Sequence, residues 1–442
     1  MQNRPTRFTN GSRLRTGLMG IGVLVVAGIG VISIWWANAM RTPVVTIPNP
    51  ILPQPNAFDF YVKAGNTIVN DKQIGDAFGV KPTVTYSTAQ KEALIQANVS
   101  VINTVHQGFA YSYHNPPIRS FDASFPYYAR FRALTRLLSL RAQARAERGD
   151  WSGAADSDLD AVRLGEDVPY GSPTIGDLVG IACQAIGRRQ LWNTVEHLNA
   201  AQTRSVMTRL TGILEHHLPY SDSVHEEKWT VQAGLLEAFN NPEKLKALTA
   251  TESDDPKKAD KAEQAEAKSI LFYLTYSKRR IMGDYSTYMD ALADQARKPY
   301  GLHLPPPPMP TDPINRDLLP IYSRGRLKDV DGETQNKLLL VTLALHGFQL
   351  EHGHYPASLS ELAPAYLQKL PDDPFAAQGT FKYIVQGKSY VLYSVGPDGK
   401  DDGGRMIDDP KHPESPDSTS PNARYFVWQN SVGDIVAGKS FW

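Results

Sequence analysis

Residues Gly353 to Phe375 read GHYPASLSELAPAYLQKLPDDPF, and this stretch decides how the C-terminal part of the chain is organised. Tyr355-Pro356 predicts the end of a helix, because the residue before a proline avoids α-helical geometry. Ser358 and Glu361 have the three-residue spacing of a capping box, which predicts a short helix starting there. The stretch therefore predicts a helix end, a turn and a second short helix in close succession.

The flanking residues extend this pattern in both directions. Residues 333–352, ETQNKLLLVTLALHGFQLEH, repeat apolar side chains at helical spacing, which predicts a buried helical face. Residues 381–395, FKYIVQGKSYVLYSV, alternate about Gly387-Lys388 and predict a β-hairpin. The C-terminal region is thus expected to contain a long helix followed by an antiparallel sheet. The predicted helical face comprises Leu338, Val341, Leu345 and Phe348.

The order of these motifs resembles the globular head of the major pseudopilin of bacterial type II secretion. It runs from the helix through Tyr-Pro, Ser-Leu-x-Glu-Leu and Leu-Pro-x-Asp-Pro-Phe to a Tyr-rich hairpin and YSVGPDGKDDGG at 393–404. The resemblance covers roughly the last quarter of the chain and implies a small pilin-like head over residues 326–442. In that family the segment after Tyr-Ser-x-Gly-x-Asp-Gly binds calcium. The residues that this implies as calcium ligands are Asp398, Asp401, Asp402, Asp408 and Asp409.

The chemistry of this loop agrees with a calcium site. Residues 398–409, DGKDDGGRMIDD, contain five carboxylates and three glycines. Calcium takes six to eight oxygen ligands, which flexible acidic loops can supply. The loop is not an EF-hand, because Lys400 stands at its third position. A polar Gly/Asp hairpin loop without metal is the alternative interpretation.

The N-terminus predicts a membrane anchor. No charged residue occurs from Thr16 to Met40, and about 20 apolar residues suffice to span a bilayer core. The preceding segment carries four arginines and no acid, which places it in the cytoplasm. We therefore expect a cytoplasmic tail over 1–16, a bilayer-spanning anchor over 17–40, and an extracytoplasmic remainder on a bacterial cytoplasmic membrane. The alternative is a signal peptide cleaved at Ala37-Asn38-Ala39.

The same region does not read as a prepilin. Prepilins share a Gly cleavage site followed by Phe-Thr-Leu-x-Glu. Phe8 and Thr9 are present here, but no glycine precedes Phe8 and no glutamate enters the apolar run. The pilin-like head is therefore expected to be a module behind a helical domain, without the filament-forming role.

The middle of the chain predicts mainly helices between two proline-rich segments. Residues 41–56 contain five prolines and predict an extended stalk. Residues 57–299 predict a helical domain, with one helix over 87–109 and a helical hairpin that turns at Gly149-Asp150. This hairpin resembles a single tetratricopeptide unit. Residues 300–325 predict a second Pro-rich linker. The helices in the middle of the chain and the sheet near its C-terminus together predict the α+β fold class.

Composition narrows the function. The 442 residues include 46 basic and 46 acidic side chains, and this zero net charge gives no overall attraction to nucleic acid or to an anionic surface, so no nucleic-acid partner is expected. The single cysteine, Cys183, lies in an apolar helical pattern and is expected in the core. We expect a scaffold that binds another envelope protein and contacts the bilayer through 17–40. The alternative is an envelope hydrolase with its site in the helical domain. Its candidate residues are His216, His225, Glu226 and Asp122.

Overall fold

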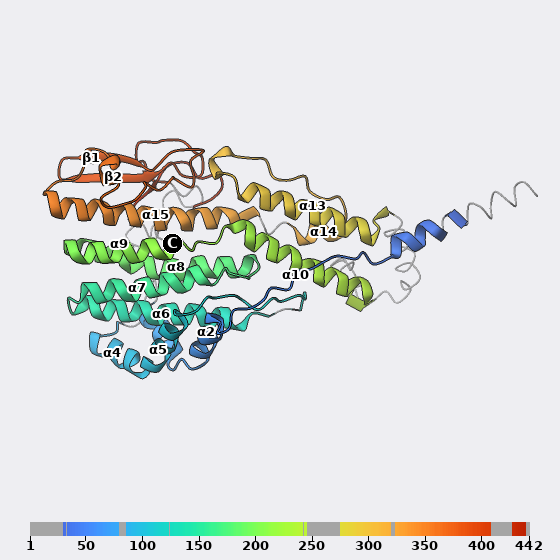
Figure 1. Ribbon diagram of the computed structural model, residues 1–442, viewed down its shortest axis with the longest axis horizontal. Coiled ribbons are helices and arrows are strands. Elements are labelled where there is room, and N and C mark those ends of the chain that lie inside the picture. Colours follow the sequence, from blue (N-terminus) through green and yellow to red (C-terminus); the bar gives the residue numbers. More distant parts are fainter. Residues whose placement is uncertain are drawn as a thin grey trace, which may run out of the picture. The chain divides into compact units, whose positions relative to one another are not determined.

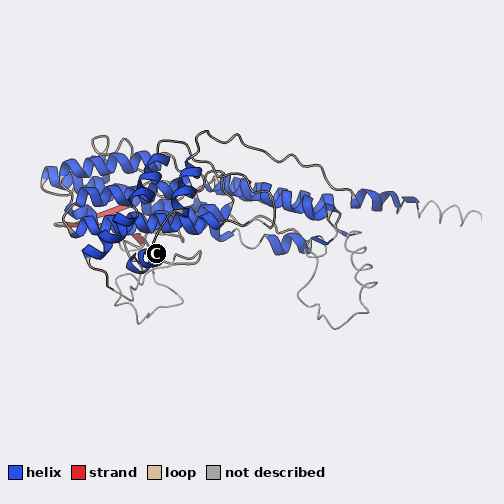
Figure 2. Cartoon of the chain, turned by 90° about the horizontal axis from the view of Figure 1, so that it is seen from below, coloured by secondary structure: helices blue, strands red, loops and turns tan. Residues whose placement is uncertain are grey.

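A computed structural model describes residues 30–31, 33–78, 85–122, 124–241, 243–244, 275–319, 323–407 and 427–438. Helices dominate, and a three-stranded antiparallel sheet lies in the C-terminal part of the chain (Figures 1 and 2). The α+β class expected from the sequence is confirmed. Among the residues with described structure, none of the helices is both long enough and apolar enough to cross a membrane. The tail 1–16 and most of the predicted anchor 17–40 lie outside the described residues.

The chain forms two compact units. The small unit comprises residues 1–46, 234–287 and 310–317, and the large unit comprises 47–233, 288–309 and 318–442. The small unit contains the helical residues 33–40, the end of α10 (Tyr220–Asn240), the start of α13 (Lys278–Ala296) and α14 (Pro313–Leu318). Asn315 donates to the Ile281 carbonyl at 2.9 Å, and the Lys278 ammonium donates to the Phe239 carbonyl at 2.7 Å. These buried hydrogen bonds join the three helices.

The large unit begins with four short helices, of which the first three pack against α6 (Pro126–Glu147) and the fourth packs against the first. They are α2 (Ala57–Asn66), α3 (Asp71–Phe78), α4 (Thr88–Ala97) and α5 (Val99–Gly108). The single helix predicted over 87–109 is divided at Asn98, so this prediction was wrong in its continuity. The buried Asn98 amide donates to the Val69 and Leu94 carbonyls and accepts from the Val69 N–H. Asparagine side chains that bond to nearby backbone in this way compete with helix continuation.

Three further helices continue the array: α7 (Trp151–Asp167), α8 (Thr174–Thr194) and α9 (Ala200–Leu214), with the 3₁₀ turn η1 (Val195–His197) after α8. The predicted turn at Gly149-Asp150 is confirmed, since Gly149 has φ +79° and the Asp150 carboxylate accepts from the Gly153 N–H. Cys183 is fully buried, and burial raises the pKa of its thiol to about 12. It is a core residue, as its sequence context predicted.

The C-terminal part is built on α15 (Ser323–His352). This helix begins inside the predicted linker and ends at His352, where Gly353 with φ +78° stops it before Tyr355-Pro356. The predicted capping box is present in η4 (Leu359–Leu362), which is a 3₁₀ turn. The predicted hairpin is β1 (Lys382–Gln386) and β2 (Ser389–Ser394), and β3 (Ile435–Val436) pairs with β2. The short 3₁₀ turn η3 (Tyr300–Leu302) lies within the Pro-rich segment.

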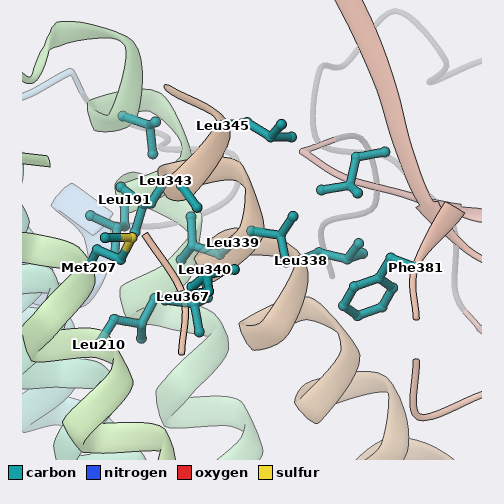
Figure 3. Close-up of a cluster of buried hydrophobic side chains, with 14 of the residues drawn as sticks. Leu191, Met207, Leu210, Leu338, Leu339, Leu340, Leu343, Leu345, Leu367 and Phe381 are labelled. Carbon is teal, nitrogen blue, oxygen red and sulfur yellow. The ribbon is translucent and has the colours of Figure 1, made fainter. Parts of the chain in front are cut away.

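One hydrophobic core joins the helical array to the sheet. Leu191 of α8 and Met207 and Leu210 of α9 pack toward one side of α15, while Leu338 lies toward Phe381 before β1 (Figure 3). The cluster continues through Leu392 and Ile435 of the sheet. Burying a leucine contributes about 1.5–3 kcal/mol, so this shared face of α15 is a major source of stability for both parts.

Candidate functional site

Two regions of the large unit gather polar and charged side chains, and the first is the predicted calcium loop. Its three described carboxylates already have protein partners. Asp401 accepts from the Tyr393 hydroxyl at 2.8 Å and from the Gly403 N–H at 3.1 Å. Asp402 pairs with Arg405 at 3.1 Å, and Asp398 accepts from the Lys400 N–H at 3.2 Å. Asp408 and Asp409 lie outside the described residues.

A fourth carboxylate, Asp434, closes this loop and was missed from the sequence. It is fully buried and accepts from the Gly404 N–H at 2.7 Å and the Asp402 N–H at 3.3 Å. Burial raises the pKa of Asp434 to about 6, although these two hydrogen bonds oppose the rise. No local pattern pointed to Asp434, because the loop that it closes lies 30 residues earlier in the chain.

The loop retains some oxygens that a cation could use. One carboxylate oxygen each of Asp398 and Asp402 is buried without a hydrogen-bond partner in the protein. In the part of the chain that the structure describes, however, no three His, Cys, Asp or Glu side chains are grouped to hold a metal ion. Two free oxygens fall short of the six to eight that calcium takes. Calcium binding therefore stays a prediction that depends on further ligands.

The second region is a pocket of about 570 Å³ beside His217. Its walls come from the start of α10, the end of α13 with the residues after it, α15, and the loop after Pro371. Both charge signs occur in the lining, so the pocket suits a ligand that carries both. The charged side chains that line it are His217, Arg297, Lys298, Arg326, Asp329, Glu333, Lys337, Asp372 and Asp373.

Behind this pocket lies a buried polar network centred on Glu166, which we call the Glu166 network: Glu166, Gln184, Arg188, His217 and Asn336. Asn336 of α15 donates to Glu166 of α7 at 3.1 Å and to Gln184 of α8 at 2.9 Å. Arg188 of α8 donates to the Asn336 side-chain carbonyl at 2.8 Å. The network joins three helices through side chains that are almost fully buried, apart from His217. The sequence signal for this network is weak: its charged and polar residues interrupt otherwise apolar helical patterns.

His217 connects the network to the pocket. Its Nδ1 lies 3.1 Å from a Glu166 carboxylate oxygen, and its Nε2 lies 3.7 Å from Asp329. Burial lowers the pKa of His217, but the hydrogen bond and charge of Glu166, with the charges of Asp329 and Glu333, outweigh burial and raise it to about 10. The imidazole is therefore protonated at neutral pH, and it acts as a fixed cation rather than as a proton acceptor.

No protein-family model, curated protein or solved structure matches the chain. The resemblance of residues 326–442 to a pseudopilin head thus stays a prediction from motif order.

The four residues named for a hydrolase site are not part of the pocket lining. The His216 carbonyl accepts a hydrogen bond from the Tyr170 hydroxyl, and the His225 ring stacks on Trp229 with centroids 5.9 Å apart. Glu226 pairs with Arg119 at 3.0 Å, while the Asp122 N–H donates to Ser120. These contacts give the His225 and Glu226 side chains, and the backbone of His216 and Asp122, separate structural roles. In the part of the chain that the structure describes, these four residues do not form a common reaction centre.

Proposed function

We propose that this chain is a membrane-anchored extracytoplasmic scaffold that binds a protein partner of the bacterial envelope. The sequence supports the membrane placement through the uncharged segment 17–40 and the arginines before it. The observation that carries the scaffold role is the shared core along α15. Because one helix packs against both α9 and the sheet, the head and the helical array of the large unit are held as one surface.

The pocket beside His217 is the partner site that fits this role. It is lined by the head loop, by α15 and by the chain after α13, so its shape depends on the union of the two parts. His217 and Arg326 present positive charges at its wall, and Glu333 and Asp372 present carboxylates. The partner chemistry that matches is an extended polypeptide segment carrying both acidic and basic side chains, since complementary charges set specificity and register.

The calcium ion belongs to the same proposal as a stabiliser of the head. It would be held by Asp398 and Asp402, whose unpaired oxygens are buried, together with Asp401 and the two later aspartates. Its role would be to join the loop segments, as the pseudopilin resemblance implies.

A crosslinked pull-down of the tagged full-length protein from its native membrane tests the partner site. The pocket variant Arg297→Glu/Lys298→Glu reverses two exposed charges at the pocket rim. The matched control Arg148→Glu/Lys388→Glu reverses two exposed charges elsewhere in the large unit. We expect the pocket variant to recover at least about tenfold less partner, because juxtaposed like charges cost several kcal/mol. Equal recovery by both variants, or no partner above background with the wild type, contradicts the proposal.

A further inference from the structure

A second pocket lies in the small unit, between the residues at 35–44 and the start of α13, and its volume is about 760 Å³. Its charge differs from that of the pocket beside His217. Arg41, Arg279 and Arg280 line it, and no acidic side chain is among its described lining residues. Trp35 and the polar residues Thr275 and Ser277 also line this pocket.

Among the residues that the structure describes, no side chain neutralises two of the three guanidinium groups. The side chains of Arg41 and Arg279 make no hydrogen bond or ion pair with the described residues. Arg280 reaches Asp284 at only 3.4 Å, one helical turn away on an exposed surface, and lies over the Tyr276 ring. Exposed pairs of this kind contribute little, so the pocket keeps a net positive charge. Gathering three like charges raises the potential in the pocket and favours an anion there.

Arginine favours one class of anion in particular. Its planar guanidinium donates two parallel hydrogen bonds to phosphate oxygens, and several arginines can share the oxygens of one tetrahedral group. The cavity is much larger than a phosphate ion and falls within the usual size range of small-molecule sites. A phosphate that carries an organic substituent therefore fits better than the bare ion.

The position of the pocket indicates the source of that phosphate. Trp35 is 46% exposed, and the preceding Val31 and Ile34 are 67% and 66% exposed. These apolar side chains belong to the end of the proposed anchor 17–40, where tryptophan is typical of the headgroup level. Arginines that directly follow such a segment lie within reach of lipid phosphates.

We propose that the pocket formed by Arg41, Arg279 and Arg280 binds a phosphate ester, supplied by the headgroup of an anionic phospholipid. Its placement at the bilayer rests on the anchor in the proposed function, whereas its affinity for phosphate rests on the three arginines alone. Binding there would tie the start of α13 to the bilayer surface and so orient the small unit at the membrane.

The test uses the full chain in detergent micelles and in nanodiscs. The pocket variant is Arg41→Gln/Arg279→Gln/Arg280→Gln, and the control Arg130→Gln/Arg148→Gln/Lys388→Gln removes as many charges elsewhere. Native mass spectrometry counts the phosphatidylglycerol retained against phosphatidylcholine, and titration with inorganic phosphate and glycerol phosphate measures competition. Each arginine near a lipid surface contributes about fivefold in affinity, so we expect the loss of three to weaken phosphatidylglycerol binding by about 100-fold, with the control unchanged.

The possible outcomes distinguish a lipid headgroup from a soluble phosphate ester, or they exclude the phosphate site. Retention of phosphatidylglycerol that millimolar phosphate does not displace supports the lipid headgroup. Ready displacement by glycerol phosphate, with the same loss in the pocket variant, supports the phosphate site but assigns it to a soluble ester. Equal binding of all these ligands by wild type and pocket variant overturns the proposal. Carbonate extraction of native membranes tests the anchor separately, so failure of the anchor and failure of the pocket give different results.

Discussion

The Asp373 carboxylate accepts a hydrogen bond from the Ser394 hydroxyl at 2.6 Å and from the Val395 N–H at 3.0 Å. It also accepts from the Phe375 N–H at 3.0 Å within its own turn. Asp373 is only 3% exposed, so water cannot take its place as the acceptor for these three donors. This one side chain joins the Leu-Pro-x-Asp-Pro-Phe motif to the Tyr-Ser-x-Gly motif, and in the sequence the two motifs are related only by their order along the chain.

Asp373→Ala should therefore destabilise the head strongly. The change leaves the Ser394 hydroxyl and two N–H groups buried without an acceptor, and each such group costs about 1–3 kcal/mol. We expect a loss of about 3 kcal/mol or more in the free energy of unfolding, measured by urea denaturation. The neighbouring Asp372→Ala is the control, because the Asp372 side chain is 63% exposed and pairs with Lys369 on the surface. Equal effects of the two substitutions would refute this role for Asp373.

The contact between α7 and α8 gives a second prediction. A Cβ placed on Gly180 would lie 2.6 Å from the Gly165 carbonyl oxygen and 2.9 Å from Pro169. Since a backbone atom cannot move aside, Gly180→Ala should separate the two helices and cost about 1–3 kcal/mol or more. Gly212→Ala in α9 has nothing within 4 Å of its new methyl group and should stabilise by up to about 1 kcal/mol. In thermal melts, Gly180→Ala should lower the melting temperature and Gly212→Ala should raise it. Similar shifts for the two variants would contradict the close packing at Gly180.

The features predicted correctly from the sequence are those with local signals. The Ser358–Glu361 capping box, the Gly149-Asp150 turn and the Gly387-Lys388 hairpin each involve residues within a few positions of one another. The start of α15 was placed too late, because the prolines of 300–325 suggested a linker. Buried Leu327 and Val330 show that the core already extends into this helix's first turns.

The Glu166 network and the closure of the acidic loop by Asp434 depend on distant pairs and could not be predicted. Asn336 and Glu166 are 170 positions apart, and only the packing of α15 on α8 and α9 brings that helix to the network. Asp434 reaches the acidic loop through the pairing of β3 with β2, and β3 is only two residues long. Neither arrangement leaves a spacing in the sequence, because the helix and strand contacts that create it are themselves long-range.

Calcium should raise the melting temperature of the full chain if the acidic loop binds it. A ligand at 100 times its dissociation constant stabilises by about 2.7 kcal/mol, which corresponds to several degrees. Asp398→Asn/Asp402→Asn should abolish the shift, because these residues hold the buried unpaired oxygens. Asp372→Asn serves as the acidic control within the head, and magnesium as the control ion. Identical midpoints with calcium and with chelator would show that the loop is closed by Asp434 and its hydrogen bonds alone.

The His217–Glu166 pair predicts a specific dependence of stability on pH. The folded-state pKa of His217, about 10, lies above the ordinary histidine value of about 6.5. The stabilisation is therefore fully present below pH 6.5 and is lost as the pH rises toward 10, at up to about 1.4 kcal/mol per pH unit. Asp329 adds its own titration, because burial raises its pKa to about 7 while the His217 charge opposes that rise. The comparison is therefore made in an Asp329→Asn background.

In that background, urea unfolding between pH 7.5 and 9.5 should show a steep fall in the free energy of unfolding when His217 is present. The additional substitution His217→Gln should flatten this part of the profile, because a neutral amide has no proton to lose. At pH 7 the same variant should also be less stable by about 3 kcal/mol, since Glu166 would stay buried without its cation. Glu166→Gln in the same background should reduce the slope as well, because it removes the main charge that raises the His217 pKa. Parallel pH profiles with and without His217 would mean that the imidazole is neutral in the folded protein, and the fixed cation assigned to the pocket wall would have to be withdrawn.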